Sequence, residues 1–114
     1  MVKGKIVLLP FPFDDFSSLK VRPALCLTNS IGDYNHLVVA FITSSVPGQI
    51  LNSDLIIDEA DKHFLPTGLK KSSTVRLHKL LTVSCKIVLR ELGRISDDDM
   101  TVVDFKIKEL FEIR

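Results

Sequence analysis

The sequence predicts one α+β domain, mainly β, in which a compact barrel of short strands precedes a single C-terminal helix. The chain has 114 residues, which suits one domain spanning residues 1–114. Short β-type apolar runs separated by turn residues occupy the chain as far as residue 95. A helix-capping signal and an apolar stripe at helical spacing follow. A barrel protects the edges of many short strands, so it is the expected arrangement.

The first strand is predicted at residues 6–9, a β-type apolar run. It is expected to end before Pro10 and Pro12, because proline cannot donate a hydrogen bond within a central strand. Residues 12–20 are rich in Asp and Ser and are expected to form a polar loop.

The second strand is predicted to begin at Arg22, because Pro23 favours an extended conformation in the residue before it. Turn residues follow at 29–35, including Gly32-Asp33. Residues 37–43 are the strongest strand prediction, since they are β-branched and apolar on both faces.

Weaker strands are predicted at residues 54–57 and 73–77, separated by a turn at residues 66–68. Residues 86–92 fit a helix or a strand. A strand is the preferred interpretation, because Gly93 would interrupt a helix.

Ser96 is the predicted N-cap of the terminal helix, and the acids at residues 97–99 complement the helix dipole. Ile95 and Met100 have the spacing of a hydrophobic staple. The apolar stripe expected to pack on the sheet comprises Met100, Val103, Ile107, Leu110 and Phe111.

Composition excludes several classes of protein. The longest apolar run, residues 37–42, is far shorter than the ~20 residues of a membrane span, and a cytoplasmic protein is expected. Cys26 and Cys85 lack metal-ligand spacing and are interpreted as buried reduced thiols. Common nucleotide-binding, zinc-protease, calcium-loop and serine-hydrolase motifs are missing from the sequence.

The net charge of +1 conceals a basic middle of the chain. Residues 62–90 contain seven cations and no acid, which indicates either a polyanion-binding face or ordinary solvated lysines. The seven are Lys62, Lys70, Lys71, Arg76, Lys79, Lys86 and Arg90.

Arg22 and Thr43 are the residues most suited to a phosphate site. If their strands pair antiparallel, both lie at one end of the sheet, where a guanidinium fork and a hydroxyl can bind phosphate oxygens. A surface arginine and a threonine that bonds its own backbone are the competing interpretations.

Both faces of the central strands are apolar, and one helix is not expected to cover them. The sequence therefore predicts a dimer.

The chain also resembles the MazF/PemK family of toxin–antitoxin ribonucleases. The resemblance covers almost the whole chain in order, and the Arg-Pro dipeptide followed by the Ile-Thr-Ser step is its most specific part. The matching stretches are residues 6–13 (IVLLPFPF), 20–25 (KVRPAL), 37–45 (LVVAFITSS), 68–71 (GLKK), 75–77 (VRL) and 92–96 (LGRIS).

This resemblance implies an SH3-like, CcdB/PemK-like barrel, a homodimer, a cognate antitoxin and DNA binding through the antitoxin complex. It also implies cleavage of single-stranded RNA without a metal or other cofactor, leaving 2′,3′-cyclic phosphate and 5′-hydroxyl ends. Arg22 and Thr43 would be catalytic. RNA-binding roles would fall to Lys20, Ser44, Lys70, Lys71 and Arg76.

Two alternatives stay open at this point: a non-enzymatic toxin of the same fold that binds DNA gyrase, and a catalytically degenerate interaction module. The general base is also open, because neither arginine nor threonine accepts a proton readily at neutral pH. His36 and His78 are the candidates.

Overall fold

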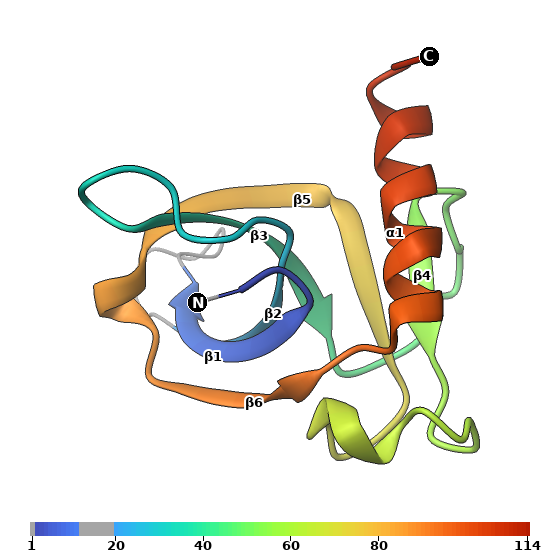
Figure 1. The fold of residues 1–114 in the computed structure, drawn as a ribbon. Coiled ribbons are helices and arrows are strands. Elements are labelled where there is room, and N and C mark those ends of the chain that lie inside the picture. The colour runs from blue at the N-terminus through green and yellow to red at the C-terminus, as the bar shows by residue number, and fades with distance from the viewer. Residues whose placement is uncertain (1, 12–19) are drawn as a thin grey trace.

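The computed structural model describes residues 2–11 and 20–114 and confirms the mainly β, α+β fold (Figure 1). The described strands form one curled antiparallel sheet in the order β4-β5-β3-β2-β1-β6. The strands are β1 (Lys5–Phe11), β2 (Lys20–Cys26), β3 (His36–Thr43), β4 (Asp54–Ile57), β5 (Ser73–Ser84) and β6 (Arg90–Arg94). The helical elements of the described residues are two short 3₁₀ helices, η1 (Leu65–Thr67) and η2 (Cys85–Ile87), and the helix α1 (Asp97–Leu110).

Strand β1 is longer than predicted, because Pro10 lies within it and pairs with Val21 of β2. On its other side β1 pairs with β6 only as far as Leu8. Among the described residues, β1 is therefore an edge at Pro10, where a missing N–H is tolerated. Lys20, expected in the polar loop, begins β2; the rest of that predicted loop lies outside the described residues.

Strand β5 also exceeds its prediction and continues to Ser84. Its pairing with β3 shifts between Ala40↔Leu80 and Phe41↔Arg76, which leaves residues 77–79 without partners on β3. Such a bulge bends a strand. The polar pair His78-Lys79 lies in this bend and interrupts the apolar pattern, so the sequence-based strand ended too early.

The segment predicted as a strand at residues 86–92 is divided. The Ser84 hydroxyl accepts a hydrogen bond from the Lys86 amide at 3.2 Å, which begins η2, and β6 starts only at Arg90. The strand prediction is correct from Arg90 onward and wrong before it. Residue 93 lies inside β6, paired with Ile6.

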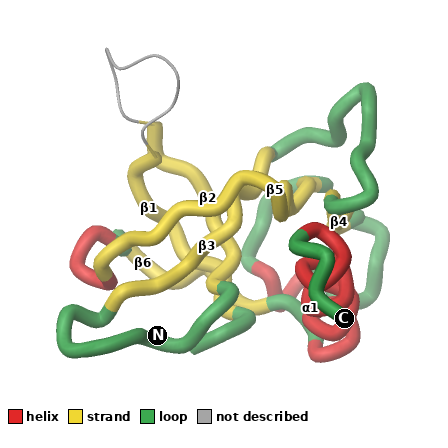
Figure 2. The backbone as a smooth tube through the Cα atoms, turned by 90° about the horizontal axis from the view of Figure 1, so that it is seen from above, coloured by secondary structure: helices red, strands yellow, loops and turns green. Residues whose placement is uncertain are grey.

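The central strands bury both faces within one chain. Leu25, Ala40 and Ile42 belong to a cluster that includes Val103 of α1. Alternate residues of the same strands belong to a second cluster, against which Cys85 and Val88 of the β5–β6 connection pack. The strand residues of this cluster include Val7, Leu9, Ala24, Cys26, Leu37 and Val39. The curl of the sheet explains this coverage (Figure 2). The premise of the dimer prediction, an uncovered apolar face, is therefore wrong, and the dimer itself stays a prediction.

Helix α1 begins as predicted, with the Ser96 hydroxyl accepting a hydrogen bond from the Asp99 amide at 3.0 Å. Val103 is fully buried, and Met100 and Ile107 pack beside it. The stripe prediction is wrong for Leu110 and Phe111, which are 37% and 55% exposed. These residues lie at the end of the helix farthest from β6 (Figure 1).

The two cysteines are free thiols, as predicted. Cys26 is fully buried, and burial raises its pKa to about 11. Cys85 is half-buried, not buried, and its Sγ lies 3.5 Å from the Ser30 hydroxyl. None of the helices within the described residues is long and apolar enough to cross a membrane.

Candidate functional site

A cavity of about 460 Å³ lies where β2, the residue after β3, the segment after η1 and β6 meet. Four of its lining residues are cations: Arg22, Lys70, Lys71 and Arg90. Ser44 adds a hydroxyl, and no acid is present among the described residues that line it. We call this the cationic cavity. Its remaining walls are largely apolar.

Arg22 reaches the cationic cavity from the middle of β2, where it pairs with Leu9 of β1. It is half-buried, and its Nη1 donates a hydrogen bond to the Val21 carbonyl oxygen at 3.4 Å. The neighbouring Pro23 also lines the cavity. The backbone at Arg22 is therefore extended, as the sequence predicts, although the strand itself starts at Lys20 and not at Arg22.

Thr43 lies at the same end of the sheet as Arg22, as predicted. The last residue pair at this end of β2 and β3 is Ala24↔Phe41, and continuing that register by two residues sets Arg22 opposite Thr43. Thr43 does not belong to the described lining of the cavity, whereas the next residue, Ser44, does. The Thr43 hydroxyl lies 3.3 Å from that of Ser45.

Lys70 and Lys71 are brought to the cavity by a close contact between two backbones. Gly68 follows η1 with φ +74°, and a Cβ added to it would lie 2.1 Å from the Leu92 carbonyl oxygen. A Cβ on Gly93 would lie 2.1 Å from the Pro66 carbonyl oxygen. Only glycine allows such an approach. It sets the segment after η1 directly on β6.

Two residues predicted to bind RNA lie elsewhere. Arg76 donates from Nε to Asp54 Oδ1 at 2.9 Å, and the Asp54 side chain has no exposed surface. A buried carboxylate needs a paired cation, so Arg76 serves the fold. Lys20 is exposed at the start of β2 and is not among the described residues lining the cavity.

Arg90 lines the cavity, although it was assigned no site role from the sequence and was named only as a member of the basic stretch. Its place depends on the pairing of β1 with β6, in which Arg90 stands opposite Leu8, another lining residue. The remaining basic residues disperse: Lys79, for example, stands 5.6 Å from the centre of the Phe41 ring. The basic stretch therefore contributes three cations to the cavity, not a continuous path.

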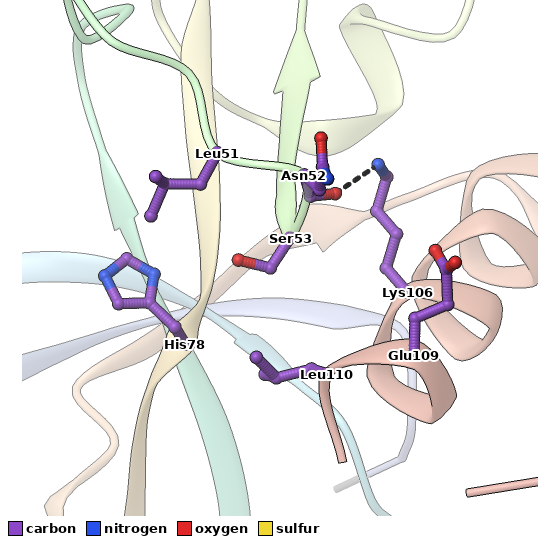
Figure 3. A pocket seen from close by; sticks show the side chains of 7 residues that line it. All are labelled: Leu51, Asn52, Ser53, His78, Lys106, Glu109 and Leu110. Carbon is purple, nitrogen blue, oxygen red and sulfur yellow. Dashed lines mark hydrogen bonds between the residues drawn. The ribbon is translucent and has the colours of Figure 1, made fainter. Parts of the chain in front are cut away.

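Neither candidate histidine is among the residues lining the cationic cavity in the described chain. His78 lines a second cavity, of about 490 Å³, between the loop before β4 and the C-terminal half of α1 (Figure 3). Lys106 of α1 crosses this region, and its Nζ donates to the Asn52 carbonyl oxygen at 2.7 Å. His36 begins β3, at the opposite end of that strand from Thr43.

The chemistry of the cationic cavity suits a chain of phosphates. Arginine binds two phosphate oxygens at once, and lysines add point charges. Apolar walls suit bases that are turned out of a stack. The fold and the site together define a small curled-sheet protein with a cavity whose described lining carries four cations.

The comparison with protein families identifies the family. Residues 2–111 match the PemK-like, MazF-like toxins of type II toxin–antitoxin systems, so the chain belongs to this family. The comparison with curated proteins gives no match.

Solved structures confirm the fold. The toxin MazF-mt6 of Mycobacterium tuberculosis has a TM-score of 0.73 at 21% identity, covering 96% of this chain and 98% of that one. MazE-MazF of Deinococcus radiodurans has a TM-score of 0.74 at 18% identity, with 100% and 97% covered. A mycobacterial endoribonuclease in complex with its cognate antitoxin has a TM-score of 0.73 at 12% identity, with 100% and 97% covered.

Proposed function

We propose that this MazF-like toxin is an endoribonuclease that cleaves single-stranded RNA at the cationic cavity without a metal ion. The observation that carries the proposal is the convergence of Arg22, Lys70, Lys71 and Arg90 on one cavity that has Ser44 at its margin. A binding surface for a neutral or cationic ligand would not gather four cations without an acid among its described lining residues.

In the proposed reaction the ribose 2′-oxygen attacks the adjacent phosphorus. The bond from phosphorus to the 5′-oxygen breaks as the new bond forms, the 2′-hydroxyl loses its proton and the departing 5′-oxygen gains one. The products are a 2′,3′-cyclic phosphate and a 5′-hydroxyl. Negative charge builds on the phosphoryl oxygens, and the fixed guanidinium of Arg22 stabilises it in the transition state.

The other residues orient the strand. Thr43 holds the phosphate or the 2′-hydroxyl, and Ser44 assists from the cavity wall. Lys70, Lys71 and Arg90 bind the neighbouring phosphates. Lys20, exposed on the approach to Arg22 along β2, attracts the strand at longer range.

The partner in this proposal is a cognate antitoxin. Two of the similar structures are described as complexes with an antitoxin or as MazE-MazF. A protein that neutralises this toxin would cover the cationic cavity, and an acidic segment complements its charge. DNA binding by the resulting complex belongs to the antitoxin.

The experiment is RNA cleavage by the purified chain in EDTA, with wild type beside Arg22→Ala. The wild type is expected to produce cyclic-phosphate ends, and the variant is expected to be slower by about 10²–10³-fold, the usual effect of removing one transition-state stabiliser. Arg94→Ala is the matched control, because Arg94 is an exposed arginine outside the described lining of the cavity that pairs with Asp97 at 3.3 Å.

Equal cleavage by wild type and Arg22→Ala would reject Arg22 as the catalytic residue. No cleavage of any single-stranded RNA by the wild type would reject the nuclease and favour a toxin that acts by binding a protein target, such as DNA gyrase.

A further inference from the structure

We infer that Thr74, a buried residue of β5, positions Thr43 for the reaction by holding Ser45 in place. The inference rests on the proposed function, because it assigns a role in the same site. Thr74 touches neither the cavity nor, in this scheme, the RNA. It is a positioning residue.

Thr74 lies on β5, between β3 and the edge strand β4. It pairs with Thr43 of β3 on one side and with Ile56 of β4 on the other, and it is fully buried. A buried hydroxyl needs a hydrogen-bond partner. The Thr74 Oγ1 finds its partner in the Ser45 carbonyl oxygen, to which it donates at 2.9 Å.

Ser45 connects this buried hydroxyl to the predicted catalytic one. It lies just after β3, and its own hydroxyl is 3.3 Å from Thr43 Oγ1. Its backbone is fixed by Thr74 and its side chain contacts Thr43. A change at Thr74 therefore reaches Thr43 through two hydrogen bonds.

The other end of the same connection is also attached to β5. Asp54 accepts hydrogen bonds from the Leu51 amide and from Arg76 Nε, both at 2.9 Å. Thr74 and Arg76 are two apart on β5, so they lie on one face of the strand. The connection between β3 and β4 is thus held at its start and at its end by one rigid strand.

This arrangement restrains Thr43, which is the last residue of β3 and has a side-chain hydroxyl that can rotate. Its reach to the scissile phosphate depends on the orientation of the first residues after β3. A misplacement of about 1 Å in a reacting group can cost 10²-fold in rate. Residues whose orientation is locked by buried hydrogen bonds avoid that loss.

The test compares two substitutions that separate the hydroxyl from the packing. Thr74→Val keeps the volume but removes the donor, whereas Thr74→Ser keeps the donor but removes a methyl group. We expect Thr74→Val to lower kcat about tenfold with little change in KM, because it disturbs orientation and not phosphate binding. We expect Thr74→Ser to retain near wild-type kcat while its Tm falls by several degrees.

If Thr74 had a purely structural role, kcat would follow Tm in the two variants. If kcat followed Tm, so that Thr74→Ser were the slower enzyme, the inference would be overturned. Equal kcat for Thr74→Val and the wild type would overturn it as well.

Two further measurements show the route of the effect. In a Thr43→Ala background, Thr74→Val should reduce kcat no further, because residues that act as one unit are not additive. Amide hydrogen exchange of residues 44–46 should accelerate in Thr74→Val and not in Thr74→Ser. The exchange readout does not need cleavage, so unchanged exchange overturns the inference even if the RNA assay fails. An inactive wild type with altered exchange would instead reject the proposed nuclease and confirm only that Thr74 holds Ser45.

Discussion

Arg90 enters the cationic cavity from β6, at the far end of the chain from Arg22 on β2. Two arginines that line one cavity from the strands on either side of β1 can contact different phosphates of the same strand. Each phosphate neutralised by a protein cation releases condensed counterions, so it steepens the dependence of binding on salt. Arg90 should therefore add to affinity without taking part in bond cleavage.

This role predicts that Arg90→Ala weakens binding and flattens its salt dependence. The probe is a single-stranded oligonucleotide lacking 2′-hydroxyls, which binds but has no internal nucleophile. The slope of log K against log[salt] should fall by roughly 0.7, the value for one phosphate on a single strand. Lys62→Ala is the matched control, since Lys62 is exposed and absent from the described lining of the cavity. An Arg90→Ala slope equal to that of Lys62→Ala would remove Arg90 from the interface.

Individual site residues were predictable where local sequence determines their position. Arg22 stands before a proline, and Lys70-Lys71 follow a glycine turn, so each carries its own local signal. The pairing of Arg76 with Asp54 was not predictable, because the two residues are 22 apart in the sequence and no short-range pattern joins them. Arg90 carries no local signal of this kind, because only the register of β6 on β1 brings it opposite Leu8.

At the scale of elements, the contact between η1 and β6 controls where the cavity lysines lie. Gly68 and Gly93 let the two backbones touch, and β6 in turn carries Arg90. The contact therefore sets two groups of cations against each other. A side chain at either glycine must separate them.

We predict that Gly93→Ala destabilises the protein by about 1–3 kcal/mol, the usual cost of overpacking, because its Cβ meets backbone atoms that cannot rotate away. Oligonucleotide affinity should also fall, since the segment carrying Lys70 and Lys71 is displaced. Thermal unfolding and the binding assay measure the two effects. Gly48→Ala is the control: an added Cβ there meets nothing within 4 Å. A Gly93→Ala protein with unchanged Tm would show that η1 and β6 move apart freely.

Helices and strands were predictable where a local sequence feature persists over the whole element or marks its start. Strand β3 and the start of α1 were correctly predicted, because an apolar run and a capping residue are local features. Strand β5 was cut short because the bulge places His78 and Lys79 in the middle of a strand. A bulge is fixed by the neighbouring strand, so the sequence of β5 alone does not reveal it.

For the whole molecule, most of the large apolar side chains that are exposed among the described residues lie outside the strands. Leu51 and Leu110 line one cavity between the loop before β4 and α1 (Figure 3). Ile50 and Phe111, each next to one of them in sequence, are 51% and 55% exposed. Exposed apolar groups gathered in this way are typical of an interface between proteins. We therefore expect the dimer interface in this region and not on a face of the sheet.

We predict that the chain sediments as a dimer at micromolar concentration and that Phe111→Glu shifts it towards monomer. A twofold interface repeats every substitution on both subunits, so one introduced charge is buried twice and faces its copy or the partner's apolar surface without a counter-charge. Leu65→Glu is the control, because Leu65 is 88% exposed on η1 and outside this region. A wild-type monomer at that concentration would reject the dimer. A dimer that survives Phe111→Glu and not Leu65→Glu would instead place the interface beside η1, near the cationic cavity.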